Sequence, residues 1–364
     1  MASRCSQGSP YEFTMADNKE NFEWCVIGAG PAGIAAVGKL LDHDIPAQKI
    51  LWIDDKFKVG DLGAKWYDVS SNTTVQLFLD FLNECSSFKF KENKQHFQIE
   101  KIDPHHACKL INIIEPLQWI SNHLSRQVAT YQGTAARLSV NNRYWEIAID
   151  RNKFMASNVI LASGAEPDRL HHKNVKEIVL EDALNYSQLK QCCDNVDSVA
   201  VFGSSHSAII VIRYLVELGL SRIVNFYKSP LKFALRMEDW TLFDNTGLKG
   251  TTADWARENI LGKIPENLYR YQATNQNIGT YLDGCDRVIY AVGFHPRVIE
   301  VAGMAELRHN VHNGIIAPGL FGFGIAFPKQ TTDPYGNRED SVGLWKFMMH
   351  INAVLPIWLR YGLR

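Results

Sequence analysis

The sequence contains seven cysteines but no C-x-x-C pair. Its only close pair, Cys192–Cys193, is vicinal, and neighbouring cysteines rarely form a disulfide because the geometry is strained. We therefore expect reduced thiols, which indicates a cytoplasmic protein. The same absence argues against a relay of two redox-active thiols.

Long apolar runs are also missing. No stretch contains the about 18 consecutive apolar residues that predict a transmembrane helix. The C-terminal stretch 343–359 comes closest, but Lys346, His350, Asn352 and Pro356 interrupt it. We therefore expect a buried helix at this position.

The chain has almost no net charge, with a formal value of -1. Nucleic acid is not an expected partner, because binding it needs an electropositive face. The pairs His105–His106 and His171–His172 would point to opposite faces of a strand, so no metal site is expected. Residues 1–14 lack the apolar core of a signal peptide, and we interpret them as a leader added for expression ahead of Met15.

What the chain does contain is the composition of a globular protein. Its 364 residues predict about two domains. A hydrophobic share of 46% and a charged share of 21% are typical of a soluble globular fold.

The first informative motif is a glycine loop near the N-terminus. A short apolar strand leads directly into Gly28-x-Gly30-x-x-Gly33, which opens a helical pattern. These glycines permit a tight turn, a close approach to a pyrophosphate and close packing of helix on strand. A second strand ends in Asp54, 21 residues after Gly33, followed by Asp55. An acid at this distance is the expected acceptor for a ribose hydroxyl, so the motif predicts a dinucleotide site.

A second loop, within residues 199–215, has serines where glycines are expected. Gly203 keeps the turn, while Ser205 and Ala208 occupy the second and third positions. Alanine is an accepted variant at the third position, and serine narrows the backbone approach without abolishing it. The hydroxyls of Ser204, Ser205 and Ser207 could donate to phosphate. From these residues alone, a working cofactor loop, a decayed one and an ordinary strand-to-helix connection all stay open.

Two later segments, 158–167 and 286–296, resemble each other. Each is a strand rich in β-branched residues, followed by a glycine, Gly164 or Gly293, and then a proline. The glycine would let the backbone leave the sheet beside a cofactor, and the proline prevents the strand from continuing.

In this order, the motifs resemble those of the two-dinucleotide-binding-domain flavoproteins, which include flavin-containing and N-hydroxylating monooxygenases. That superfamily has an FAD loop, a first "ATG-like" strand, an inserted nicotinamide domain, a second "ATG-like" strand and a return to the FAD domain. The return resembles residues 317–324, and the similarity covers about residues 20–360. It implies an α/β fold with a Rossmann-like FAD-binding domain and an inserted, smaller Rossmann-like NAD(P)-binding domain. The implied boundaries are 15–168 with 283–364 for FAD, and 169–282 for NAD(P)H.

The resemblance places the serine-containing loop where the superfamily has its nicotinamide loop. The strand that follows ends in Tyr227 and Lys228 rather than in an acid. A lysine would pair with a 2′-phosphate, so NADPH is favoured over NADH. The alternative is that Lys228 is only a solvated charge at the end of a strand.

Residues 59–88 resemble the flavin-containing monooxygenases in particular. The matching patterns are Gly63-x-x-Trp66, Ser71-Asn72-Thr73 and Phe78-x-Asp80-Phe81. The resemblance implies that Asn72 lies beside the flavin, where a C4a-(hydro)peroxyflavin is held, and Asn72 is our catalytic candidate. A neutral amide can both donate and accept there. The alternative role for Asn72 is an Asx cap of the helix that follows.

Two departures keep other functions open. The family's Phe-x-Gly-x3-His pattern is absent before the second loop, and Ile325 stands where disulfide reductases have an aspartate. The expected function is oxygenation of a small nucleophilic substrate with dioxygen. The alternatives are an NAD(P)H dehydrogenase that reduces a quinone or protein carrier, and a non-catalytic flavin-binding regulator. The oligomeric state, including a homodimer, stays open, and residues 333–340 are expected to form a polar connection or, alternatively, a substrate-gating loop.

The resemblance implies two sets of cofactor contacts. The FAD set is Gly28, Gly30, Pro31, Ala32, Gly33, Asp54, Asp55, Lys56, Lys65, Trp66, Asn72, Ala136, Ala162, Ser163, Gly164, Gly324, Ile325 and Val342. The NADPH set is Gly203, Ser204, Ser205, His206, Ser207, Ala208, Tyr227, Lys228, Ala291 and Gly293.

Overall fold

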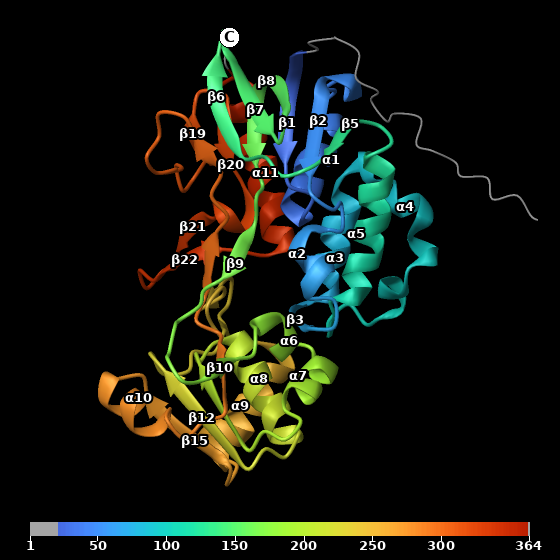
Figure 1. Cartoon of the computed structure of the whole chain (residues 1–364). Coiled ribbons are helices and arrows are strands. Elements are labelled where there is room, and N and C mark those ends of the chain that lie inside the picture. The colour runs from blue at the N-terminus through green and yellow to red at the C-terminus, as the bar shows by residue number, and fades with distance from the viewer. Residues whose placement is uncertain (1–20, 363–364) are drawn as a thin grey trace, which may run out of the picture.

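The computed structural model describes residues 21–362, and they form two lobes, each built on its own sheet (Figure 1). The interpreted leader, residues 1–14, lies outside the described residues. Two chain crossings connect the lobes, because the second lobe is inserted into the first (Figure 1).

The first sheet has nine strands, with the parallel strands β1, β2, β5 and β8 side by side. Residues 24–27 of β1 and 50–53 of β2 are apolar and buried, as is typical of strands covered on both faces. An antiparallel meander, β6–β7–β8, extends one edge. The strands are β1 (Asn21–Ile27), β2 (Ile50–Asp54), β5 (Ala129–Gln132), β6 (Arg137–Asn141), β7 (Tyr144–Ile149), β8 (Asn152–Leu161), β18 (Glu300–Val301), β19 (Ile315–Ala317) and β20 (Leu320–Gly322).

Helices pack on one face of this sheet, and they are α1 (Pro31–Asp42), α3 (Val75–Glu84), α4 (Phe90–Asn93), α5 (Ile111–Leu124) and α11 (Leu344–Trp358). The predicted buried C-terminal helix is confirmed as α11, which places Met348, Ile351 and Trp358 in the core. Among the described residues, no helix has the length and apolar character needed to span a membrane.

The second sheet is parallel throughout, in the order β10-β16-β11-β12-β15. Its strands are β10 (Lys176–Glu177), β11 (Ser198–Phe202), β12 (Arg222–Tyr227), β15 (Leu268–Gln272) and β16 (Arg287–Tyr290). The helices around it are α6 (Leu180–Ala183), α7 (Tyr186–Cys192), α8 (His206–Glu217), α9 (Gly250–Ala256) and α10 (Asn275–Tyr281). β16 pairs within this sheet, although the sequence analysis assigned residues from 283 onward to the first domain.

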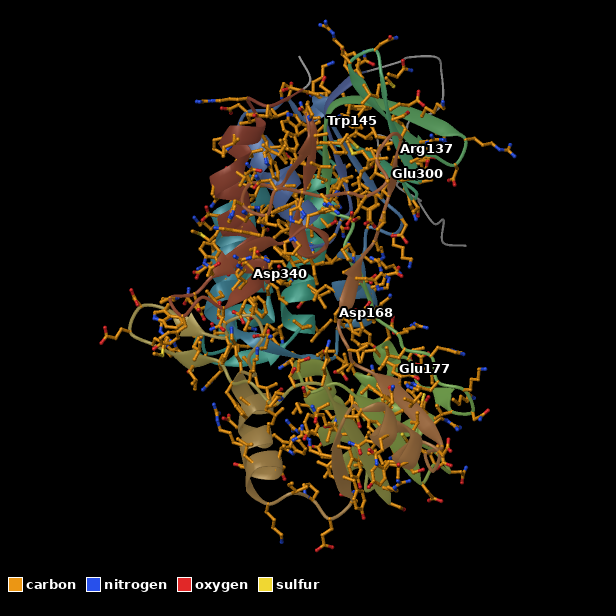
Figure 2. The ribbon with its side chains drawn as sticks, turned by 90° about the vertical axis from the view of Figure 1, so that its left-hand side faces the viewer. Arg137, Trp145, Asp168, Glu177, Glu300 and Asp340 are labelled. Carbon is orange, nitrogen blue, oxygen red and sulfur yellow. The ribbon has the colours of Figure 1, made fainter. Side chains whose placement is uncertain are left out.

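Short strand pairs occupy the region between the lobes. β9 (Ala165–Pro167) pairs with β17 (Phe294–Pro296) where the two crossings run together. In Figure 2, Asp168 and Glu177 mark the first of these crossings. The other pairs are β3 (Ser70–Thr74) with β4 (Ala107–Lys109), β13 (Leu235–Arg236) with β14 (Thr241–Leu242), and β21 (Lys329–Thr332) with β22 (Arg338–Ser341).

The expectation of a plain polar connection at 333–340 is wrong, because residues 338–340 are part of strand β22. Glu339 of that strand is buried, and it accepts hydrogen bonds from the backbone N–H groups of Asn245 and Thr246 in the second lobe. Figure 2 shows Asp340, its neighbour, at the lower end of the first lobe. The segment is therefore an interlobe contact rather than a solvated loop.

Candidate functional site

A cavity of about 1130 Å³ opens between the lobes. One end is lined by Gly28 and Gly30 of the first glycine loop, and the other by Ser207 at the start of α8. Asn72 and Trp66 lie on the same lining. The cavity therefore joins the two loops that the sequence singled out.

The first loop has the backbone geometry that its glycines predict. Gly28 has a φ of +111°, and a Cβ there would lie 2.2 Å from the carbonyl oxygen of Ala162. A Cβ on Gly33 would lie 1.8 Å from the carbonyl oxygen of Gly28, so helix and strand touch through backbone. No side chain caps α1, whose N-cap is Gly30. The free N–H groups and the positive end of the helix dipole suit a phosphate.

The Asp54 carboxylate, which was predicted to accept a hydrogen bond from a ribose hydroxyl, instead binds backbone N–H groups. One carboxylate oxygen accepts from the Ala29 N–H at 2.7 Å, and the other accepts from the N–H groups of Lys56 and Phe57. The side chain therefore fixes the shape of the loop. Asp55, which pairs loosely with Lys56 at 3.5 Å, also lines the cavity and has more freedom to bind a ligand hydroxyl.

The second loop repeats the geometry of the first. Gly203 has a φ of +127°, and a Cβ there would lie 2.2 Å from the carbonyl oxygen of Ala291. α8 also lacks a side-chain cap, with Ser205 as its N-cap. The Ser204 hydroxyl donates to the carbonyl of Ser229, so this hydroxyl proton is already used, whereas Ser207 faces the cavity. Among the three interpretations that the sequence left open, this geometry favours a working cofactor loop.

The predicted residues divide into three groups by position. On the cavity lining are Gly28, Gly30, Pro31, Ala32, Asp54, Asp55, Lys56, Lys65, Trp66, Asn72, Ala162, Ser163, Gly164, Ser207, Ile325 and Val342. Behind it, Gly33 and Gly324 pack backbone against the turn and against Ala32. Outside the lining are Ala136, Gly203, Ser204, Ser205, His206, Ala208, Tyr227, Lys228, Ala291 and Gly293, and Thr134 and Ala135 take the place expected for Ala136.

Asn72 lies in β3 and is exposed to the cavity. Its only side-chain hydrogen bond among the described residues is to the Thr73 hydroxyl, at 3.3 Å. The alternative role as an Asx cap is wrong, because α3 begins at Val75 with Thr74 as its N-cap. The amide of Asn72 is thus available to a ligand.

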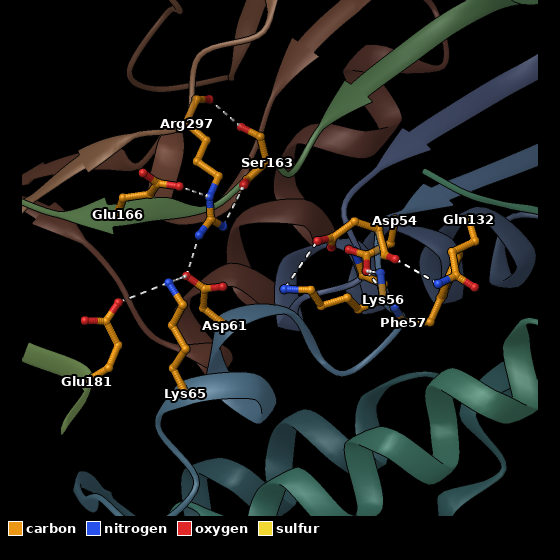
Figure 3. A network of polar contacts seen from close by, with 12 residues as sticks. Asp54, Lys56, Phe57, Asp61, Lys65, Gln132, Ser163, Glu166, Glu181 and Arg297 are labelled. Carbon is orange, nitrogen blue, oxygen red and sulfur yellow. Dashed lines mark hydrogen bonds and ion pairs between the residues drawn. The ribbon is translucent and has the colours of Figure 1, made fainter. Parts of the chain in front are cut away.

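A charged network centred on Arg297, which the sequence motifs did not predict, lies on the cavity lining (Figure 3). Its guanidinium binds Glu166 at 2.8 Å and also Asp61, and its backbone carbonyl accepts from the Ser163 hydroxyl. Burial lowers the pKa of Arg297, but the hydrogen bonds to Glu166 and Asp61 raise it more. The only sequence signal was an arginine directly after the second proline motif.

Lys65 extends this network to the second lobe (Figure 3). Its ammonium pairs with Asp61 and with Glu181, each at 3.2 Å. Asp61 and Lys65 belong to helix α2 (Gly60–Lys65), whereas Glu181 belongs to α6. The network therefore ties the loop after β2 to both lobes.

The middle of the cavity is apolar. The rings of Trp66 and Phe294 meet edge to face at 6.3 Å, and Val69 and Leu110 pack against the core of the second lobe. All four side chains line the cavity, as do Gly28 of the first glycine loop and Ser207 of the second. Apolar walls of this kind would limit the contact of a bound flavin with water.

Two sheets with parallel strands at their centres, each followed by a glycine turn and an uncapped helix beside one cavity, define a two-dinucleotide-binding-domain flavoprotein fold. No family model matches the chain. It is 31% identical to monooxygenase AgnR1 of Paecilomyces divaricatus over 388 residues, covering 92% of this chain and 97% of that protein. The chain therefore belongs to the monooxygenase family that AgnR1 represents.

Solved structures agree with this fold. The ornithine N-hydroxylase of Kutzneria sp. 744, solved with reduced FAD, NADP⁺ and L-ornithine, matches with a TM-score of 0.65 and 12% identity, covering 94% of this chain and 99% of that one. The L-lysine 6-monooxygenase of Pseudomonas syringae matches with a TM-score of 0.63 and 14% identity, covering 94% and 100%. These structures confirm the predicted fold class, and together with the relationship to AgnR1 they confirm the predicted superfamily.

Proposed function

We propose that the protein is an FAD-dependent, NADPH-using monooxygenase that oxygenates a small nucleophilic molecule with dioxygen. The observation that carries this proposal is the single cavity that joins the two glycine loops. In such a cavity, an isoalloxazine and a nicotinamide can meet between two phosphate anchors. Membership of the AgnR1 family supports oxygenation as the outcome.

The residues present fit FAD in the first lobe. The close contact of Gly28 with Ala162 leaves no room for a side chain, and the N-terminus of α1 offers unpaired N–H groups. Asp54 holds this loop in shape, and Asp55 is placed to accept from a ribose hydroxyl. When bound, FAD would accept a hydride from NADPH and pass the electrons to dioxygen.

The second lobe fits NADPH by the same reasoning. The uncapped start of α8 suits the pyrophosphate, and Ser207 lies on the cavity wall. Lys228 is exposed at the end of β12, where the adenosine ribose of a Rossmann-like site is bound. The lysine charge favours a 2′-phosphate over a bare hydroxyl.

Asn72 and the apolar walls would set the chemistry in the middle of the cavity. The Asn72 amide can donate to an oxygen that gains negative charge, which lowers the cost of forming that charge. Trp66 and Phe294, in edge-to-face contact, would cover part of a bound flavin and so limit the access of water that favours loss of electrons to hydrogen peroxide.

The test uses the purified holoprotein and ¹⁸O₂. We expect a yellow protein that NADPH bleaches without oxygen, and one labelled oxygen atom in the product of a turned-over amine or sulfide. The other atom leaves as water. Reduction of an artificial dye by NADPH with no labelled product would contradict the monooxygenase function.

We also propose a cytoplasmic location. All six cysteines among residues 21–362 are free thiols, which suits a reducing compartment. Separation of soluble and membrane fractions of the source cells, with immunodetection, tests this.

A further inference from the structure

A largely covered guanidinium stands at one edge of the second sheet without a carboxylate partner. Arg270 of β15 lies opposite Asn225 of β12, and its Nε donates to the Asn225 side-chain oxygen at 2.9 Å. The guanidinium also lies over the Tyr227 ring, 4.9 Å from its centre. Among the described residues, no carboxylate forms an ion pair with Arg270, and the ring face of Tyr227 is its cation–π partner.

Asn225 connects this arginine to the nucleotide loop. The amide is fully buried, and its nitrogen donates to the carbonyl oxygens of Val201 at 3.0 Å and Gly203 at 2.8 Å. The Ser204 hydroxyl joins the same loop to the chain just after Lys228, through the Ser229 carbonyl. Arg270, Tyr227 and Lys228 are therefore held around the end of β12.

A covered cation without a counter-ion is costly. Burial lowers the pKa of Arg270, yet an arginine keeps its proton at physiological pH. The Nη atoms of Arg270 have no hydrogen bond among the described residues, and their spacing matches two oxygens of a phosphate.

We propose that Arg270, held by Asn225 and Tyr227 and assisted by Lys228, binds the 2′-phosphate of NADPH. This inference rests on the proposed function, which makes a nicotinamide dinucleotide the ligand of the second lobe. The end of the second strand of a Rossmann-like fold is where the 2′-position of the adenosine ribose is bound. NADH lacks this phosphate and leaves the guanidinium unpaired, so Arg270 makes the site selective for NADPH.

Binding of adenosine 2′,5′-bisphosphate and of 5′-AMP to the holoprotein, measured by calorimetry, tests the subsite without turnover. We expect the unmodified protein to bind the bisphosphate at least about tenfold more tightly, since charged hydrogen bonds are worth that much or more. Arg270→Gln should lose this preference while its affinity for 5′-AMP stays unchanged, and Arg270→Lys should keep part of it. Arg257→Gln is the matched control, because Arg257 also covers an aromatic ring, Phe233, but pairs with Asp254.

Equal affinity of the unmodified protein for the two ligands would overturn the subsite, as would an equal loss of both ligands in Arg270→Gln. If Arg270→Gln does not fold, Arg270→Lys decides instead, because it keeps the positive charge but loses the paired donors of the guanidinium: an undiminished preference then rejects the subsite. The two proposals fail separately. If the protein incorporates labelled oxygen but shows no preference for the bisphosphate, the monooxygenase function stands and the subsite is rejected. If it prefers the bisphosphate but incorporates no labelled oxygen, the subsite stands and the monooxygenase function is rejected.

Discussion

At the residue scale, Asn72 is exposed and has one long hydrogen bond, so its replacement should change chemistry rather than stability. Asn72→Ala should keep its flavin and alter the free energy of unfolding by less than about 0.5 kcal/mol. Loss of one donor to a developing charge should lower the rate of product formation by roughly 10²-fold. Product and hydrogen peroxide, measured per NADPH oxidised, check this.

The control for this change is Asn141→Ala, which removes an exposed amide from the far β6–β7 hairpin. It should leave both yields unchanged. A normal product yield in Asn72→Ala would show that the amide takes no part in the reaction.

His350 should make stability depend on pH. It is 5% exposed, and burial, followed by the charges of Lys329 and His309, lowers its pKa from 6.5 to about 4. The folded protein thus holds His350 neutral where the unfolded chain binds a proton, so stability falls as the pH drops from 6.5 to about 4. At pH 5 the loss should be about 2 kcal/mol, from ~1.4 kcal/mol per pKa unit.

His350→Leu should remove this loss. Urea unfolding at pH 7 and pH 5 should show that the difference in unfolding free energy between variant and unmodified protein shifts by about 2 kcal/mol in favour of the variant at pH 5. His312→Leu, at an exposed position, should show no such shift. If the difference in unfolding free energy between His350→Leu and the unmodified protein were the same at pH 7 and pH 5, folding would not lower the pKa of His350.

Single residues also show which features of the site could be predicted from the sequence and which could not. Glycine spacing predicted Gly28 and Gly203, because few backbones other than a nucleotide loop demand those positions. The sequence could not predict the contact of Arg297 with Glu166 or of Arg270 with Asn225, because these partners are separated by 131 and 45 residues along the chain. The order of motifs along a chain does not contain such pairings. For the same reason, the sequence could not show that the Asp54 carboxylate binds backbone N–H groups.

At the scale of elements, apolar strands and the C-terminal helix were predictable because their burial is reflected in their composition. The hairpin β21–β22 was not, since its residues are polar and turn-forming. Glu339 is buried there only because Asn245 and Thr246 supply its hydrogen bonds. A partner from another lobe therefore decides the structure of this segment.

The two glycine turns belong to different lobes, so a substitution in one turn should impair the binding of one cofactor and not of the other. Gly203→Ala forces a side chain to φ +127° and to 2.2 Å from the Ala291 carbonyl oxygen. The backbone strain alone should cost about 1–3 kcal/mol, and the second lobe must distort further to relieve the clash. We expect NADPH binding to be lost while the flavin content stays normal, as measured by titration and absorbance.

Gly219→Ala is the control that measures backbone strain without a steric clash. Gly219 also has a positive φ, +75°, but no atom lies within 4 Å of the point where its Cβ would be. It should cost only the backbone strain and keep NADPH binding. Normal NADPH affinity in Gly203→Ala would mean that the serine-containing loop does not carry the nucleotide.

At the scale of the whole molecule, three of the contacts that join the lobes among residues 21–362 bear on the cavity. Charged groups of α2 meet Glu181, and Val69 and Leu110 enter the core of the second lobe. In the third contact, Glu339 and Lys346 hold the segment 244–249. Lys346 is one residue from Phe347, which lines the cavity, so this third contact bears directly on the shape of the site.

Removing Glu339 should loosen that third contact first. Its carboxylate accepts from the N–H groups of Asn245 and Thr246 at 3.1 and 3.2 Å, and from the Thr246 hydroxyl. Glu339→Ala leaves these donors unpaired, which should cost about 1–3 kcal/mol for each one that water cannot reach. Hydrogen exchange should rise in 243–249 and in β22, while β6 and β7 keep their protection. Glu306→Ala is the control, because it removes a carboxylate whose only ion pair among the described residues is with exposed Arg308. It should leave hydrogen exchange unchanged outside the immediate surroundings of residue 306. If Glu339→Ala instead raised exchange evenly in both lobes, the segment would be part of one cooperative fold, and the lobes would not be able to separate at this contact alone.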